Sequence, residues 1–163
     1  MARRVVDRSV IESEIAAQSL DSMVASRRTR RSAVSKATIE REIADIERRV
    51  AENDWRSLKP AQLVAVYAWC HDRAYGVRPD DLTGATWSDA RKRAGLMVKR
   101  DFGGDVDAAL EFLRWVWGRE EGRIEWKKAN GRPIRRLTWH DQFTARWLLS
   151  DYRVDQSVRQ GIR

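Results

Sequence analysis

Residues 123–139 read RIEWKKANGRPIRRLTW, and the interpretation of this stretch decides the fold expected for the second half of the chain. Asn130-Gly131 lies at its centre, and this dipeptide favours a two-residue β-hairpin turn because both turn positions need a positive φ. Pro133 has no N–H to donate, so it would lie on an edge. The stretch therefore predicts a small β-hairpin, and a solvated loop between two helices is the alternative.

Positive charge is concentrated in the same stretch. Its single acid is Glu125, and its basic residues are Arg123, Lys127, Lys128, Arg132, Arg135 and Arg136. A basic hairpin between two helices is the element with which a winged-helix module contacts a phosphate backbone. Trp126, among these charges, either stacks on an exposed base of a single strand or packs the stretch against the last helix.

The composition predicts one mostly helical domain with an extension. The chain has 163 residues, of which 42% are hydrophobic and 34% are charged, and only three are proline. Eight tryptophans indicate a core built on large aromatic side chains. The formal net charge of +8 favours an acidic partner, and nucleic acid is the commonest one.

Cysteine content and hydropathy indicate the compartment. Cys70 is the single cysteine, so an internal disulfide is excluded, and its apolar context predicts a buried structural thiol. The first ten residues lack the apolar run of a signal peptide, and no window has 18 apolar residues. We therefore expect a cytoplasmic protein that does not contact a membrane.

Residues 1–54 predict an N-terminal helical arm. Ser9 can cap a helix that runs to about Ser26. A cluster without acids follows, and it consists of Arg27, Arg28, Arg30 and Arg31. This cluster is either a phosphate-binding arm or a solvated linker.

A second helix of the arm is expected from Thr38 to about Glu52. Its apolar residues have the 4, 3, 4 spacing of a heptad seam and are Ile39, Ile43, Ile46 and Val50. Two heptads are too short to be stable alone, so this seam needs a partner. The candidates are the first helix, the main domain or another subunit, and the seam is accordingly a predicted docking surface.

Residues 55–155 are expected to form the compact domain, followed by a polar tail at 156–163. A helix should begin near Pro60 and stop at Gly76. The later helices are expected at 87–101, at 105–117 after a cap by Asp105, and at 139–152 after a cap by Thr138. The helix at 87–101 carries the basic residues Lys92, Arg93, Lys99 and Arg100, so it is the better candidate to face DNA.

The motifs of catalysis and cofactor binding are missing from the sequence. There is no glycine-rich phosphate loop. His71 and His140 are the only histidines, and neither lies at metal-ligand spacing from a second ligand. We therefore expect no enzyme activity, no cofactor, no metal and no small-molecule substrate.

Residues 87–152 resemble the C-terminal modules of phage replication proteins of the replisome-organiser and helicase-loader type. The resemblance is carried by a basic helix, by the segment DVDAALEFLRWVW at 105–117, and by a basic connector before a short last helix. It implies binding to DNA and to a replicative helicase, and an origin in a phage or mobile element.

Two functions are expected from these observations. The first is a small nucleic-acid-binding accessory protein that contacts the phosphate backbone without catalysis, with DNA favoured over RNA. The second is a structural or assembly subunit, in a virion or a larger nucleoprotein complex, that docks or self-associates through its N-terminal helices.

Overall fold

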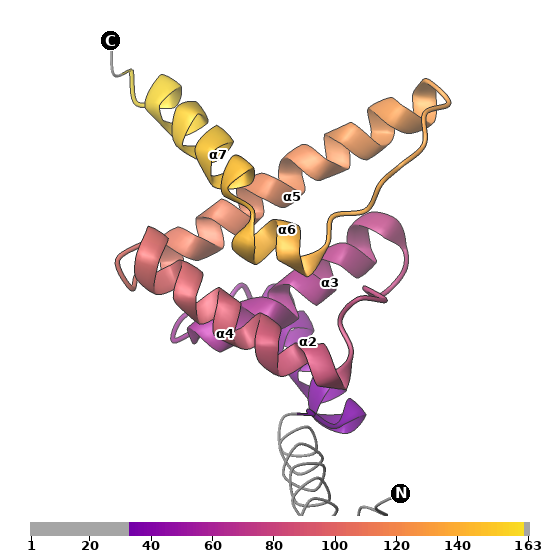
Figure 1. Ribbon diagram of the computed structural model, residues 1–163, viewed down its shortest axis with the longest axis vertical. Coiled ribbons are helices and arrows are strands. Elements are labelled where there is room, and N and C mark those ends of the chain that lie inside the picture. Colours follow the sequence, from indigo (N-terminus) through magenta and orange to yellow (C-terminus); the bar gives the residue numbers. More distant parts are fainter. Residues whose placement is uncertain (1–32, 162–163) are drawn as a thin grey trace, which may run out of the picture. The chain divides into compact units, whose positions relative to one another are not determined.

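Residues 33–161 are described by a computed structural model, and within them the chain forms six α-helices, one 3₁₀ turn and no β-strand (Figure 1). The elements in order are α2 (Lys36–Glu52), η1 (Pro60–Gln62), α3 (Leu63–Tyr75), α4 (Gly84–Asp101), α5 (Val106–Ala129), α6 (Trp139–Thr144) and α7 (Arg146–Arg159). The prediction of a mostly helical fold is confirmed.

Local signals set most helix ends. The Asp105 carboxylate accepts the amide hydrogens of Asp107 and Ala108 and so caps α5. Thr138 caps α6 by accepting from the amide of Asp141. Gly76 ends α3 with φ of +70°, a conformation that costs glycine little. All three ends were predicted from the sequence.

The β-hairpin predicted at 123–139 is wrong. A type I′ turn needs positive φ at both central residues, but Asn130 has φ of −103° and only Gly131, at +61°, is left-handed. The amide of Arg132 donates to the carbonyl of Lys127 at 2.9 Å, which is a helix stop. Residues 130–138, here called the connector, then run without regular structure to α6 (Figure 1). The winged-helix expectation therefore fails over this stretch.

Helix α5 is longer than the segment 105–117 that the sequence predicts. It passes through Gly118 and Gly122, and each of these costs about 1 kcal/mol relative to alanine in a helix interior. The additional turns bury Glu120 and Ile124, which are 4% exposed each. Tertiary packing therefore offsets the weak local preference.

The single helix expected at 139–152 is divided at Ala145. This residue has ψ of 121°, and α7 starts on its far side in a new direction (Figure 1). Helix α7 continues to Arg159, well into the tail expected at 156–163. The break directs the first turn of α7 toward both α4 and α5.

Helix α3 lies at the centre of the core. Residues 63–68 are all buried, and α3 contacts α2, α4, α5 and α6. Its Tyr67, His71 and Tyr75 pack their rings against Trp117 of α5. Nδ1 of His71 donates to the carbonyl of Val77 at 2.7 Å, and burial lowers the pKa of this histidine. Burial likewise raises the pKa of the Cys70 thiol to about 12, consistent with a structural role.

Helix α2 belongs to the compact unit Val34–Arg163. Ile43 and Ile46 are 3% and 0% exposed in the core that α2 shares with α3, and Ile39 and Val50 pack at its margin. The seam therefore packs on the main domain of the same chain, which buries Ile43 and Ile46 and leaves Ile39 and Val50 partly exposed. The boundary expected after residue 54 consequently lies within this unit.

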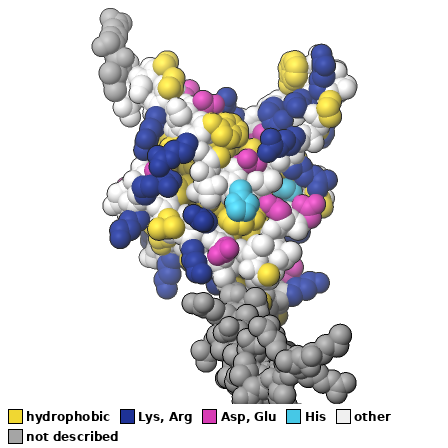
Figure 2. Space-filling view, viewed as in Figure 1, with side chains coloured by type: hydrophobic (Ala, Val, Ile, Leu, Met, Phe, Trp, Pro, Cys, Tyr) yellow, Lys and Arg dark blue, Asp and Glu magenta, His cyan; other side chains and the backbone are white. Residues whose placement is uncertain are grey.

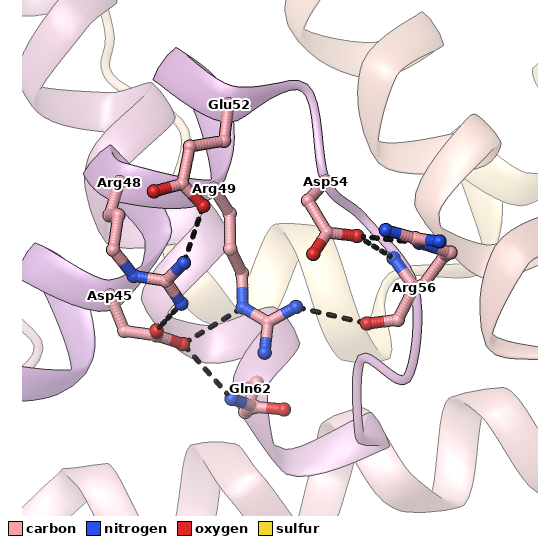
Figure 3. Close-up of polar contacts among 7 residues, drawn as sticks. All are labelled: Asp45, Arg48, Arg49, Glu52, Asp54, Arg56 and Gln62. Atoms are coloured by element: carbon pink, nitrogen blue, oxygen red, sulfur yellow. Dashed lines mark hydrogen bonds and ion pairs between the residues drawn. The ribbon is translucent and has the colours of Figure 1, made fainter.

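Polar contacts fix the end of α2 to the loop that follows it (Figure 3). Asp45 accepts from Arg48 at 2.6 Å and from Arg49 at 2.9 Å, and the Gln62 amide approaches the same carboxylate at 3.5 Å. Arg49 also donates to the carbonyl of Arg56 at 3.0 Å. The guanidinium groups depress the pKa of Asp45, so the carboxylate is charged in this network.

The expected helix Ser9–Ser26 and the cluster Arg27, Arg28, Arg30 and Arg31 lie outside the described residues. Within residues 33–161, no helix combines the length and apolar character needed to cross a bilayer.

Candidate nucleic-acid interface

The basic residues predicted on α4 are all exposed, and they form two rows along the helix. Arg93 and Arg100 are seven residues apart and share one face, and Lys92 and Lys99 form a row about 100° away. Lys92 Nζ is 3.9 Å from Asp89, and such an exposed ion pair contributes little to stability. Arg93 and Lys99 have no hydrogen bond or ion pair among residues 33–161.

Two arginines of α7 join the first row. Arg100 and Arg146 line one small cavity, and Arg153 donates to the carbonyl of Asp101 at 3.5 Å. Arg93, Arg100, Arg146 and Arg153 are here called the α4–α7 patch. Figure 2 shows basic side chains gathered over the C-terminal end of α4 and the start of α7, with few acidic ones between them.

A nearly buried carboxylate organises the α4–α7 patch. Asp101 has 5% of its side chain exposed and accepts two hydrogen bonds from Arg100, at 2.5 and 2.9 Å. These bonds, and then the charges of Arg146 and Arg153, lower the pKa of Asp101. One carboxylate is thus close to three guanidinium groups, so the surface keeps a net positive charge. The charge-assisted hydrogen bonds between Arg100 and Asp101 fix the position of the Arg100 side chain.

Two predicted residues of the connector, Arg135 and Arg136, line a second basic site. A cavity of about 460 Å³ lies between α5, the connector and α7, and it is here called the α5–α7 cleft. Its cations are Arg119, Arg123, Arg135 and Arg136, and its acids are Glu120 and Asp141. Figure 2 shows a second gathering of basic side chains along the C-terminal part of α5.

The acids of the cleft are engaged in structural contacts. Glu120 accepts from Tyr75 Oη and from Arg123, whose Nε lies 2.6 Å from Oε2. Asp141 caps the α6 N-terminus through Thr138 at 2.9 Å and is 3.7 Å from Arg135. Arg136, by contrast, is exposed and has no ion pair or hydrogen bond within residues 33–161. The cleft can therefore attract an anion.

The remaining predicted residues lie at the end of α5 and in the turn after it (Figure 1), and they do not line the α5–α7 cleft. Lys127 donates to the carbonyl of Pro133 at 2.9 Å and so closes the turn after the helix. Lys128 and Arg132 are exposed there. Trp126 is 59% exposed, so the expectation that it packs against the last helix is not met.

The first turn of α7 lies between the α4–α7 patch and the α5–α7 cleft. Arg146 belongs to the patch, and the next residues, Trp147 and Leu148, line the cleft. Sequence reasoning missed Arg119, Arg146, Trp147 and Arg153. One available signal was the seven-residue spacing of Arg146 and Arg153, which Lys92 and Lys99 also have.

The side chains of these two sites are chemically suited to an anion. No group of three or more His, Cys, Asp or Glu side chains in the described part of the chain could hold a metal ion. Helix α7 starts without a side-chain cap, so its partial positive end adds to the arginines around it. Comparison with protein-family models, with curated proteins and with solved structures gives no significant match.

Proposed function

We propose that this chain binds nucleic acid by contacting phosphates through the α4–α7 patch. The supporting observation is that cations from two helices distant in sequence lie together around one buried acid, Asp101. Guanidinium groups bind phosphate in a bidentate geometry, and such contacts carry no base preference. The chain would act without catalysis, as an accessory protein of the phage or mobile-element type that the resemblance implies, with DNA favoured over RNA.

The test compares two variants that remove the same amount of charge. Arg93→Gln, Arg146→Gln and Arg153→Gln together alter the patch and keep the Arg100–Asp101 pair. Lys36→Gln, Arg41→Gln and Lys59→Gln remove three exposed cations of α2 and the loop before α3. At low salt, fluorescence anisotropy should show that the patch variant binds duplexes of any sequence about tenfold or more weakly than the wild type.

The control variant should bind nearly as tightly as the wild type, because it loses the same total charge but keeps every arginine of the α4–α7 patch. Equal losses in the two variants would show that attraction is diffuse rather than local to the patch. No binding of the wild-type chain to duplex, single-stranded DNA or RNA at low salt would refute the proposal.

A structural or assembly subunit is the second candidate, and one observation favours it. Val154 and Val158 are 62% and 73% exposed, and they are four residues apart on one face of α7. Such apolar side chains are suited to a protein partner. Self-association in light scattering, together with no affinity for any oligonucleotide, would favour this candidate over the first.

A further inference from the structure

The α5–α7 cleft combines positive charge with an apolar floor. Val116, Leu137 and Leu148 lie at its base and are at most 9% exposed. Its volume of about 460 Å³ is in the range of small-ligand pockets, so it can enclose a single nucleotide but not a stacked duplex. A strand can therefore enter only where a base has left its stack.

Hydrogen bonds fix the connector wall of the cleft. Tyr67 Oη donates to the carbonyl of Leu137 at 2.9 Å, and the amide of Leu137 donates to Tyr75 Oη at 2.9 Å. Arg123 also donates to the carbonyl of Arg135 at 2.6 Å. Because these groups are held before a ligand arrives, the ordering cost of binding is reduced.

Two arginines of the cleft are placed to meet a phosphate. The Arg119 guanidinium lies 4.6 Å from the centroid of the Trp115 ring and 3.3 Å from Asp151, an exposed contact that a ligand can replace. Arg136, on the connector, is exposed and has no hydrogen bond or ion pair within residues 33–161. The two side chains come from different walls, so they can approach one anion from two sides.

Trp147 gives the cleft an aromatic surface. It is 53% exposed although it lines the cavity, so a large area of its indole is open to solvent beside the arginines. Aromatic rings next to a basic groove stack on the bases of single strands, and this stacking tolerates any sequence. Trp126 is exposed to a similar extent, at 59%, but does not line the cleft.

We infer that the α5–α7 cleft holds one unstacked nucleotide of a single strand, with its base on Trp147 and its phosphate between Arg119 and Arg136. This inference rests on the proposed function and adds the class of nucleic acid, because a duplex cannot present a base to the cleft. The α4–α7 patch, on the other side of the first turn of α7, then contacts phosphates of the same strand.

The experiment uses the two exposed tryptophans as a matched pair in the full-length chain. Trp147→Leu, Trp126→Leu and Arg136→Gln are each titrated with a short labelled oligothymidylate, a mixed-sequence duplex and a glutamate-rich peptide. Trp147→Leu should weaken oligothymidylate binding about tenfold, as expected for the loss of one stacked base, and should leave duplex binding unchanged. Arg136→Gln should also weaken the single strand more than the duplex, whereas Trp126→Leu should change neither.

Several outcomes would overturn the inference. Equal losses of oligothymidylate affinity in Trp147→Leu and Trp126→Leu would show that the cleft does not bind the base. Equal losses of single-strand and duplex affinity in Trp147→Leu would show that the cleft does not select single strands. A glutamate-rich peptide that binds as tightly as oligothymidylate, and loses as much in Trp147→Leu, would point to an acidic protein segment instead. Wild-type binding to duplex but not to oligothymidylate would reject this inference alone, and binding to neither of them nor to RNA would reject the proposed function as well.

Discussion

Leu137 has both backbone polar groups bound by tyrosine hydroxyls of α3, one from Tyr67 and one from Tyr75. Tyr75 has a second role, because its Oη also donates to the buried Glu120. Burial and the Glu120 hydrogen bond raise the pKa of Tyr75, so the hydroxyl stays protonated and can donate. Through these contacts, one hydroxyl joins α3, α5 and the connector.

Tyr75→Phe is expected to destabilise the chain by about 1–3 kcal/mol, because a buried amide and a buried carboxylate each lose a partner. Urea unfolding followed by circular dichroism measures this change. Tyr152→Phe is the matched control, since the Tyr152 hydroxyl has no hydrogen bond within residues 33–161, and it should cost less than about 0.5 kcal/mol. Similar losses of unfolding free energy in both variants would show that the Tyr75 hydrogen bonds to Leu137 and Glu120 do not stabilise the fold.

At the scale of the elements, α4 begins against the segment that leads into α2. The amide of Val34 donates to the carbonyl of Gly84 at 2.8 Å. A Cβ built on Gly84 would lie well inside contact distance of the Val34 carbonyl oxygen, whereas a Cβ on Gly95 of the same helix meets nothing within 4 Å. The two glycines therefore serve different purposes.

Gly84→Ala should destabilise the chain by about 1–3 kcal/mol although alanine is the better helix former, because the added methyl separates α4 from Val34. Gly95→Ala should stabilise it by about 0.5–1 kcal/mol through backbone entropy alone. Urea midpoints at an unchanged slope give both values. A gain in stability from Gly84→Ala would contradict the packing described here.

Local sequence signals predicted where the helices of this fold exist, but they did not predict how long each helix is. Caps at Asp105 and Thr138 and the stop at Gly76 depend on a few adjacent residues, so they could be identified from the sequence. The continuation of α5 to Ala129 depends on burial of Glu120 and Ile124 against residues distant in the chain. The hairpin prediction was wrong for a related reason: Asn130-Gly131 suits the end of a helix as well as a hairpin turn, and local sequence does not distinguish the two.

At the scale of the whole molecule, the candidate interface depends on the turn at Ala145. The basic residues of α4 could be predicted because the helix itself places them on one side. The spacing of Arg146 and Arg153 indicates only that they share a face of their helix, and the place of that face and of Trp147 beside α4 and α5 follows from the direction that α7 takes. Lys127 and Arg123, which were predicted as ligand contacts, also bond Pro133 and Glu120 within the fold.

Phosphate contact by the α4–α7 patch can be measured from the salt dependence of duplex binding. Each phosphate that a cation neutralises contributes about 0.9 to the slope of log Kobs against log salt. The wild-type chain should show a steep slope, and the variant Arg93→Gln, Arg146→Gln, Arg153→Gln should lower it by roughly 2 to 3 units. A slope that is the same in the wild type and in this variant would contradict phosphate contact by the α4–α7 patch.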